Sequence, residues 1–200
     1  MSDLREFDLV IFGATGYAGY FMVRELVLSI DEQPDEYRNI RWAIAGRNIA
    51  KLEDTLIRLG KELGRDLSSV EKIQADAGDE ESLQRMAKRT ALVVNVVGPY
   101  NLYGRPVVEA CVEAGTHHID ISGEMTYIEE MQIEYDLRAR ANDCLIISTC
   151  GWDSIPNDIG LDYLKTHFDG KLHSVESFMC ILPGESVSFL SMCLSANCPL

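Results

Sequence analysis

Short apolar runs alternate with longer amphipathic stretches along most of the chain. The apolar runs cover residues 8–12, 40–45, 70–75, 91–97, 117–121 and 144–148. Between these runs, apolar side chains recur every three or four residues, and Leu52, Leu56, Leu59 and Leu63 form one such stripe. Short apolar runs predict strands, whereas a period near 3.6 predicts amphipathic helices. The pattern therefore predicts six strands, each followed by a helix.

The order of these elements favours an α/β fold. The expected helices cover residues 17–30, 49–63, 79–89, 104–114, 127–141 and 154–168. The run 91–97 is almost wholly apolar, which is typical of a central parallel strand covered on both faces. Together these elements predict a doubly wound parallel sheet, the Rossmann arrangement, over residues 1–168. We expect residues 169–200, with a strand near 172–182, to be the start of a second, incomplete α/β domain.

A glycine-rich segment joins the first expected strand to the first expected helix. Its GxxGxxG spacing is a variant of the dinucleotide-binding fingerprint. The first glycine allows a tight turn, the second lets the backbone approach a pyrophosphate, and the third lets the helix pack closely on the sheet. Free N–H groups at the helix start then face the phosphates. The residues expected to bind are Gly13, Ala14, Thr15, Gly16, Tyr17 and Gly19. The alternative is a glycine turn that binds no ligand.

The end of the second expected strand indicates which dinucleotide binds. NAD enzymes usually carry an acidic residue there, which hydrogen-bonds the ribose 2′-hydroxyl. This chain has Arg47 and Asn48 instead, with Lys51 one turn later. A guanidinium attracts a 2′-phosphate and stacks on adenine, so the sequence favours NADP over NAD. Asp76 ends the third strand, where its carboxylate can reach the adenine amino group. A solvated surface residue is the alternative for Arg47 and for Asp76.

The end of the fourth expected strand is a second candidate for cofactor contact. Ligands of doubly wound sheets bind beyond the carboxyl ends of the strands, near the point where the strand order reverses. Gly98 and Pro99 lie at this position, followed by Tyr100 and Tyr103. Gly98 would let the backbone approach the cofactor, and the two tyrosines would border the nicotinamide. A Gly-Pro turn without a ligand explains the same residues.

Three polar residues follow or end the fifth expected strand. Strand alternation places His118 and Asp120 on one face, and Glu124 comes just after the strand. Each carboxylate lies near the expected cleft, and the imidazole could exchange protons. For His118 and Asp120, the alternative is a buried and hydrogen-bonded side chain. No catalytic residue is assigned on this basis.

The end of the sixth expected strand leads into the last helix. Asp153 or Ser154 would cap that helix, while Trp152 would wall a substrate pocket. Cys150 raises a rival chemistry, because some Rossmann dehydrogenases attack the substrate with a cysteine thiolate. Short-chain dehydrogenase chemistry is disfavoured, because no tyrosine is followed four residues later by lysine.

Composition narrows the possible partners. A formal net charge of −14 disfavours nucleic-acid binding, which needs clustered Lys and Arg. The six cysteines form no CxxC pair and no metal-ligand spacing, which favours reduced, intracellular cysteines and no metal. The acidic first residues do not form a signal peptide, and no apolar run is long enough to span a bilayer. A soluble protein is therefore expected.

Taken together, the motifs resemble the saccharopine-dehydrogenase-like oxidoreductase family. The matching stretches are residues 12–19, 45–47, 98–104, 109–124 and 151–158. The resemblance implies an NADP-type Rossmann domain followed by a mixed α/β substrate domain. It also implies an oxidoreductase with a small-molecule or lipid-like substrate. Bacterial members include enoyl reductases of glycolipid assembly, and eukaryotic members are associated with lipid droplets and membranes, so a cytoplasmic or lipid-surface location follows from the resemblance.

The resemblance also suggests what is missing. Family members are about twice this long, and from residue 183 onward the chain no longer resembles their second domain. Three functions therefore stay open. They are an NADP-dependent oxidoreductase, a dinucleotide-binding module or scaffold without catalysis, and a chain that forms a homo-oligomer with full-length copies through a strand near residues 172–182.

Overall fold

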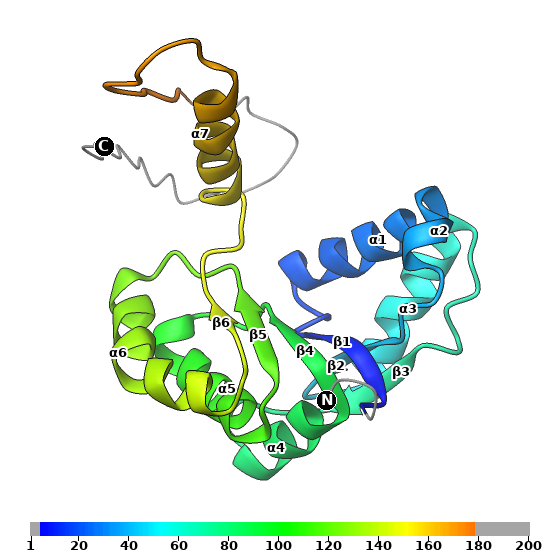
Figure 1. Ribbon diagram of the computed structural model, residues 1–200. Helices are drawn as coiled ribbons and strands as arrows, with labels where there is room; N and C mark the ends of the chain where they lie inside the picture. The colour runs from blue at the N-terminus through cyan, green and yellow to red at the C-terminus, as the bar shows by residue number, and fades with distance from the viewer. Residues whose placement is uncertain (1–4, 179–200) are drawn as a thin grey trace. The chain divides into compact units, whose positions relative to one another are not determined.

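The computed structural model describes residues 5–178 of the chain, and its centre is a six-stranded sheet (Figure 1). The strands are β1 (Phe7–Phe12), β2 (Trp42–Gly46), β3 (Glu71–Gln74), β4 (Thr90–Asn95), β5 (His117–Asp120) and β6 (Ile146–Ile147). All neighbouring pairs are parallel, in the order β3-β2-β1-β4-β5-β6. The order reverses between β1 and β4, so the doubly wound fold is confirmed.

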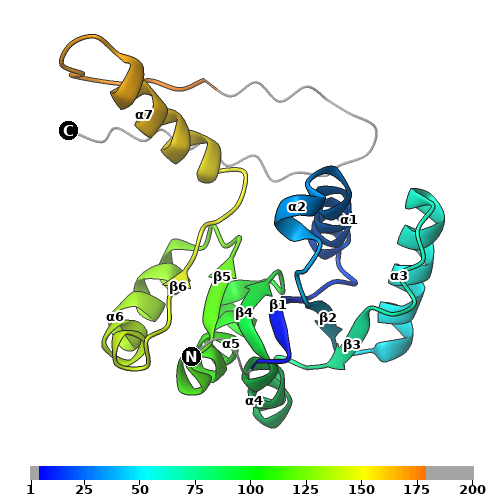
Figure 2. The ribbon, with the colours of Figure 1, turned by 45° about the vertical axis from the view of Figure 1, so that its right-hand side comes forward.

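Helices connect the strands and cover both faces of the sheet (Figures 1 and 2). They are α1 (Tyr17–Glu32), α2 (Pro34–Tyr37), α3 (Ile49–Leu63), α4 (Glu80–Arg89), α5 (Tyr100–Ala114) and α6 (Met125–Ala141), and a further helix, α7 (Ile155–His167), follows β6. Helices α1 and α3 bury one apolar cluster against Ile11 and Ile44, and α4 and α5 bury another against Val10 and Phe12. Because side chains alternate along a strand, β1 contributes to both clusters.

A third cluster joins α5 and α6 beside β5. Tyr100 and Val108 of α5 contact Tyr127, Met131 and Tyr135 of α6 within it. The Tyr100 and Tyr127 rings lie 5.5 Å apart between centroids. This packing fixes the starts of both helices near the carboxyl end of β5, where the candidate site lies.

Most expected elements match the structure to within a few residues, but four details differ. Helix α5 begins at Tyr100 rather than 104, and β6 is only two residues long. The loop expected around Pro34 is the short helix α2, with proline in its first turn. Of the strand expected at 172–182, residues 172–178 have no regular structure and the rest lies outside the described residues.

The chain divides into two compact units after Gly151, and the expected domain boundary at residue 168 stays a prediction. The first unit holds the sheet and helices α1–α6. The second begins at Trp152 and contains α7, which buries none of its residues. No helix among residues 5–178 is long and apolar enough to cross a membrane.

Candidate dinucleotide-binding site

The glycine loop after β1 closes tightly against the sheet. Gly13 has a φ of 98°, a left-handed conformation that favours glycine, and its N–H donates to the Ala45 carbonyl over 2.9 Å. A Cβ atom on Gly13 would lie 2.8 Å from Cγ2 of Val97. A Cβ atom on Gly19 would lie 2.2 Å from the Gly13 carbonyl oxygen. Neither position has room for a side chain, so the loop and the start of α1 can approach each other only through glycine.

The start of α1 has no side-chain cap. Gly16 is the N-cap residue, no side chain hydrogen-bonds to it, and no acidic residue lies in the first turn. Thr15, Gly16 and Tyr17 are exposed at this end of the helix. The first N–H groups of a helix have no partner within the helix, and they carry partial positive charge. The first turn of α1 can therefore bind the phosphates of a dinucleotide.

The loop after β2 presents a cation beside the glycine loop. Arg47 is exposed, and within residues 5–178 no carboxylate pairs with its guanidinium. Asn48 caps α3 by accepting a hydrogen bond from the Lys51 N–H over 3.1 Å. The sequence analysis did not predict this capping role of Asn48. Its contact with the cofactor stays a prediction.

Asp76 follows β3 at the same edge of the sheet. One carboxylate oxygen accepts a hydrogen bond from the Gly78 N–H over 3.0 Å, which closes a local turn. The Ser82 hydroxyl accepts a hydrogen bond from the Asp76 N–H over 3.0 Å. The turn holds Asp76 at the expected place, and its contact with adenine stays a prediction.

The β4–α5 loop lies directly behind the glycine loop. Val96 donates its N–H to the Phe12 carbonyl over 2.9 Å, and the Gly98–Pro99 bond is cis. Gly98 and Pro99 are exposed, whereas Tyr100 is buried and its hydroxyl donates to the Asn95 carbonyl over 3.0 Å. The Tyr100 ring therefore lies in the interior and not at the surface where a nicotinamide would bind. Tyr103 is exposed, and the expected contact of that ring stays a prediction.

Asp120 is a fully buried carboxylate that ties three segments together. It accepts hydrogen bonds from the Tyr127 and Ser148 hydroxyls, each over 3.0 Å. It also accepts the N–H groups of Ser122, over 2.9 Å, and Thr149, over 3.3 Å. Four donors compensate the loss of hydration of the carboxylate. Asp120 is thus a structural anchor for the end of β6.

His118 lies on the same face of β5 and is also fully buried, as the strand alternation predicts. Neither ring nitrogen has a hydrogen-bond partner among the described residues, so the expected hydrogen bond is absent. Burial away from water lowers the pKa of the imidazole to about 4, although the carboxylate of Asp120 opposes this change. The ring is therefore neutral at physiological pH.

Comparison with known proteins identifies the cofactor domain. Residues 9–147 match the family described as "Saccharopine dehydrogenase NADP binding domain". The chain belongs to this family. A Caenorhabditis elegans "Lipid droplet localized protein" is 43% identical over 183 residues, which cover 92% of this chain and 42% of the relative. A human "Saccharopine dehydrogenase-like oxidoreductase" is 42% identical over 187 residues, which cover 92% of this chain and 43% of the relative.

A solved structure shares the fold of this saccharopine dehydrogenase-like chain. It is the Saccharomyces cerevisiae saccharopine dehydrogenase (L-Glu forming), with a TM-score of 0.56 and 16% sequence identity. The match covers 80% of this chain and 30% of the yeast chain. The chain spans less than half the length of the curated relatives described above.

The family's cofactor, NADP, fits the residues present. The first turn of α1 offers unpaired N–H groups to the pyrophosphate, and glycines 13 and 19 leave no side chain in the way. Arg47 supplies a positive charge at the strand end where a 2′-phosphate is recognised, and no acidic residue stands there to repel it. The expected cofactor is confirmed by the family. Its individual contacts stay predictions.

The rival chemistry based on Cys150 lacks an activated thiol. Burial and the charge of Asp120 raise the pKa of the Cys150 thiol, and its sulfur lies 3.7 Å from the Ile147 carbonyl oxygen. A reactive cysteine needs the opposite shift, toward a thiolate at neutral pH. The structure therefore disfavours Cys150 as a nucleophile in this saccharopine dehydrogenase-like chain.

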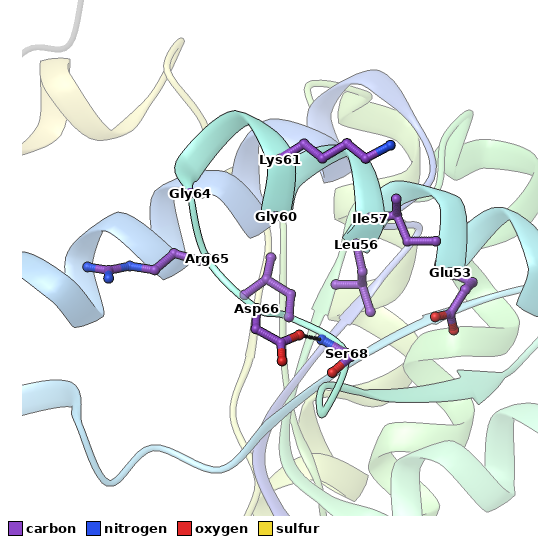
Figure 3. A pocket seen from close by; sticks show the side chains of 10 residues that line it. Glu53, Leu56, Ile57, Gly60, Lys61, Gly64, Arg65, Asp66 and Ser68 are labelled. Carbon is purple, nitrogen blue, oxygen red and sulfur yellow. Dashed lines mark hydrogen bonds between the residues drawn. The ribbon is translucent and has the colours of Figure 1, made fainter.

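Two hollows lie near α3. One lies at its carboxyl end, lined by residues including Leu56, Gly60 and Lys61, with Asp66 accepting a hydrogen bond from the Ser68 N–H (Figure 3). Some of its lining residues come just before β3, so this hollow lies at the amino end of that strand. The glycine loop lies at the opposite, carboxyl ends of the strands. The second adjoins Thr15 and Gly16, and there the Arg58 guanidinium lies 4.0 Å above the Tyr20 ring. No sequence pattern predicts this cation, because Arg58 and Tyr20 lie on different helices that meet only in the fold.

Proposed function

We propose that this chain is the NADP(H)-binding part of an oxidoreductase that acts on a lipid-related substrate. The observation that supports it most directly is the uncapped start of α1, which follows the Gly13 turn and lies beside the exposed Arg47. This combination suits a dinucleotide pyrophosphate with a 2′-phosphate on the adenosine half. The bound cofactor supplies the hydride, and the protein binds it and orients its nicotinamide ring.

The roles of the chain's own residues follow from their places. The N–H groups of the first turn of α1 bind the pyrophosphate, and Arg47 binds the 2′-phosphate as a charge-assisted hydrogen-bond donor. Asp76 accepts a hydrogen bond from the adenine amino group. The backbone at Gly98 and Pro99 lies beneath the nicotinamide half, where the sheet order reverses.

A lipid-related substrate is supported by the name of one relative, a lipid-droplet protein that is 43% identical to this chain. A glycolipid as the particular substrate is supported only by the resemblance to bacterial enoyl reductases of glycolipid assembly. We infer an intracellular protein that works at or near a lipid surface. We also propose that the chain associates with further copies of itself, which sedimentation velocity would measure.

Calorimetric titration tests the cofactor site. NADPH and NADH are titrated in parallel into the wild-type chain, an Arg47→Ala variant and an Arg85→Ala control. Arg85 is an exposed arginine on α4, the helix that covers the other face of the sheet. We expect NADPH to bind more tightly than NADH, and we expect Arg47→Ala alone to lose about 1.5–3 kcal/mol of NADPH binding free energy. Equal affinity for the two cofactors would contradict the NADP assignment.

A binding module without catalysis is the second candidate, and the state of the acid–base groups favours it. Burial raises the pKa of the Tyr100 and Tyr127 hydroxyls above their usual range, and Asp120 is saturated by four donors. Steady-state NADPH oxidation with lipid-like carbonyl and enoyl substrates separates the two functions. Turnover supports the oxidoreductase, whereas NADPH binding without turnover supports the module.

A further inference from the structure

Helix α5 is capped by a residue far away in the sequence. Its N-cap position is Pro99, which has no side-chain hydrogen bond to offer. The two carboxylate oxygens of Glu124 take this place, and they accept the N–H groups of Tyr100, over 2.6 Å, and Asn101, over 2.8 Å. A carboxylate at a helix start is favoured by the helix dipole and removes two unpaired donors. Unlike α1, helix α5 therefore has no free N-terminal donors at these two positions.

Glu124 is itself held in place. It is the N-cap residue of α6, and its carbonyl accepts the Ile128 N–H over 3.1 Å. Its own N–H donates to the Ser122 hydroxyl over 3.0 Å. A single residue thus joins the starts of α5 and α6. Because these two hydrogen bonds hold the Glu124 backbone, its carboxylate can hold the start of α5 in place.

The start of α5 connects directly to the cofactor loop. The preceding residues pack so closely on Gly13 that a Cβ atom there would lie 3.1 Å from the Val96 carbonyl oxygen. In a doubly wound sheet, the two halves of a dinucleotide lie on the two sides of the point where the strand order reverses. Arg47 and Asp76 follow β2 and β3 on the adenine side, and Gly98 follows β4 on the other side.

We propose that Glu124 is a positioning residue for the nicotinamide half of NADP. By binding the first turn of α5, its carboxylate fixes the backbone from Gly98 to Tyr100, the surface beneath the nicotinamide. Within residues 5–178, its hydrogen bonds are to Tyr100, Asn101, Ser122 and Ile128, and none is to Arg47 or Asp76. The inference rests on the proposed function, because it requires that this chain bind NADP(H) at the glycine loop.

Two ligands separate this role from a general effect on folding. NADPH fills both halves of the site, whereas 2′,5′-ADP carries only the adenosine half with its 2′-phosphate. Both are titrated into the wild-type chain, Glu124→Gln, Arg47→Ala and Glu130→Gln. The last is the matched control, because Glu130 lies on α6 in a surface ion pair with Arg105. Nicotinamide fluorescence of bound NADPH gives a second readout.

Glutamine keeps one acceptor, but its amide NH₂ group faces the second N–H donor. We therefore expect Glu124→Gln to weaken NADPH binding about tenfold and to change nicotinamide fluorescence, with 2′,5′-ADP affinity unchanged within about twofold. Arg47→Ala should weaken both ligands, and Glu130→Gln neither. If Glu124→Gln does not fold, Glu124→Asp is titrated with the same expectation, because its shorter side chain cannot reach both donors.

The possible results are distinct. Equal loss of both ligands in Glu124→Gln, or no loss of either, overturns the positioning role while NADP binding stands. If the wild-type chain binds neither ligand, the proposed function fails and the inference falls with it. Selective loss of NADPH affinity in Glu124→Gln, together with loss of both ligands in Arg47→Ala, supports the two-sided assignment of the site.

Discussion

The buried carboxylate of Asp120 accepts the Tyr127 hydroxyl over 3.0 Å, across the interface between β5 and α6. Asp120 also holds Ser148 and Thr149, and its carbonyl oxygen accepts the Cys150 N–H over 2.7 Å. Thr149 has a φ of 62°, a left-handed conformation that costs free energy for a residue other than glycine. The hydrogen bonds to Asp120 compensate that cost, so this carboxylate determines the path of the chain as it leaves β6.

Removing this carboxylate should be much worse than removing one of its donors. Asp120→Ala leaves two buried and two partly buried donors without an acceptor, and we expect it to lower the free energy of unfolding by about 3–5 kcal/mol. Tyr127→Phe removes one hydrogen bond to a charged group and should cost about 1.5 kcal/mol. Urea denaturation followed by circular dichroism measures both values. A cost for Asp120→Ala no larger than that for Tyr127→Phe would refute the anchoring role.

The contact between Gly19 and Gly13 predicts a sharp effect of one methyl group. Gly19→Ala places a Cβ atom 2.2 Å from the Gly13 carbonyl oxygen, so α1 must move away from the loop. We expect NADPH affinity to fall by at least about 100-fold, because the phosphate-binding N–H groups move with the helix. Gly160→Ala is the control, since no atom of residues 5–178 lies within 4 Å of its Cβ position in α7. It should leave NADPH affinity unchanged, as calorimetry would show.

The sequence predicted local features of this fold better than distant ones. Helix α3 begins at Ile49 and ends at Leu63 as expected, because its apolar stripe is regular and Gly64 stops it in a left-handed conformation. Helix α5 begins four residues before its predicted start. No local residue signals that start, because its cap is Glu124, more than twenty positions later in the chain. When the capping residue is distant in sequence, no local sequence pattern predicts where the helix begins.

The candidate site shows the same difference between local features and features that depend on residues distant in sequence. The glycine spacing could be recognised because the turn and the start of α1 are adjacent in sequence, whereas the role of Arg47 stays a prediction. The burial of His118 and Asp120 on one face followed from strand alternation. The inward position of the Tyr100 ring depends on α6, and so it could not be predicted from the residues around Tyr100 alone.

The buried His118 predicts a loss of stability in mild acid. Unfolded, the imidazole takes up a proton below its ordinary pKa of 6.5, whereas the folded chain protonates it only near pH 4. Between these values the unfolded state binds more protons, so lowering the pH favours unfolding, by up to about 3 kcal/mol across the window. His118→Leu should flatten the dependence of unfolding free energy on pH from 6.5 to 4.

Exposed His173 provides the control for this measurement. His173→Gln should keep the slope of the wild-type chain, because it replaces an exposed side chain and leaves the buried His118 in place. Urea denaturation at a series of pH values gives the slopes. An unchanged slope in His118→Leu would mean that other groups cause the acid sensitivity.

Arg47 differs from the glycine loop in how it contacts the rest of the protein, because the loop glycines pack closely and Arg47 does not. Its side chain is exposed and lacks a carboxylate partner within residues 5–178, while Asn48 beside it caps α3 independently. The cofactor preference that we propose for Arg47 would therefore reside in a position that can mutate at little cost to stability. Evolution, or a protein engineer, could exchange NADP for NAD preference here through an acidic substitution, without rebuilding the turn that both cofactors require.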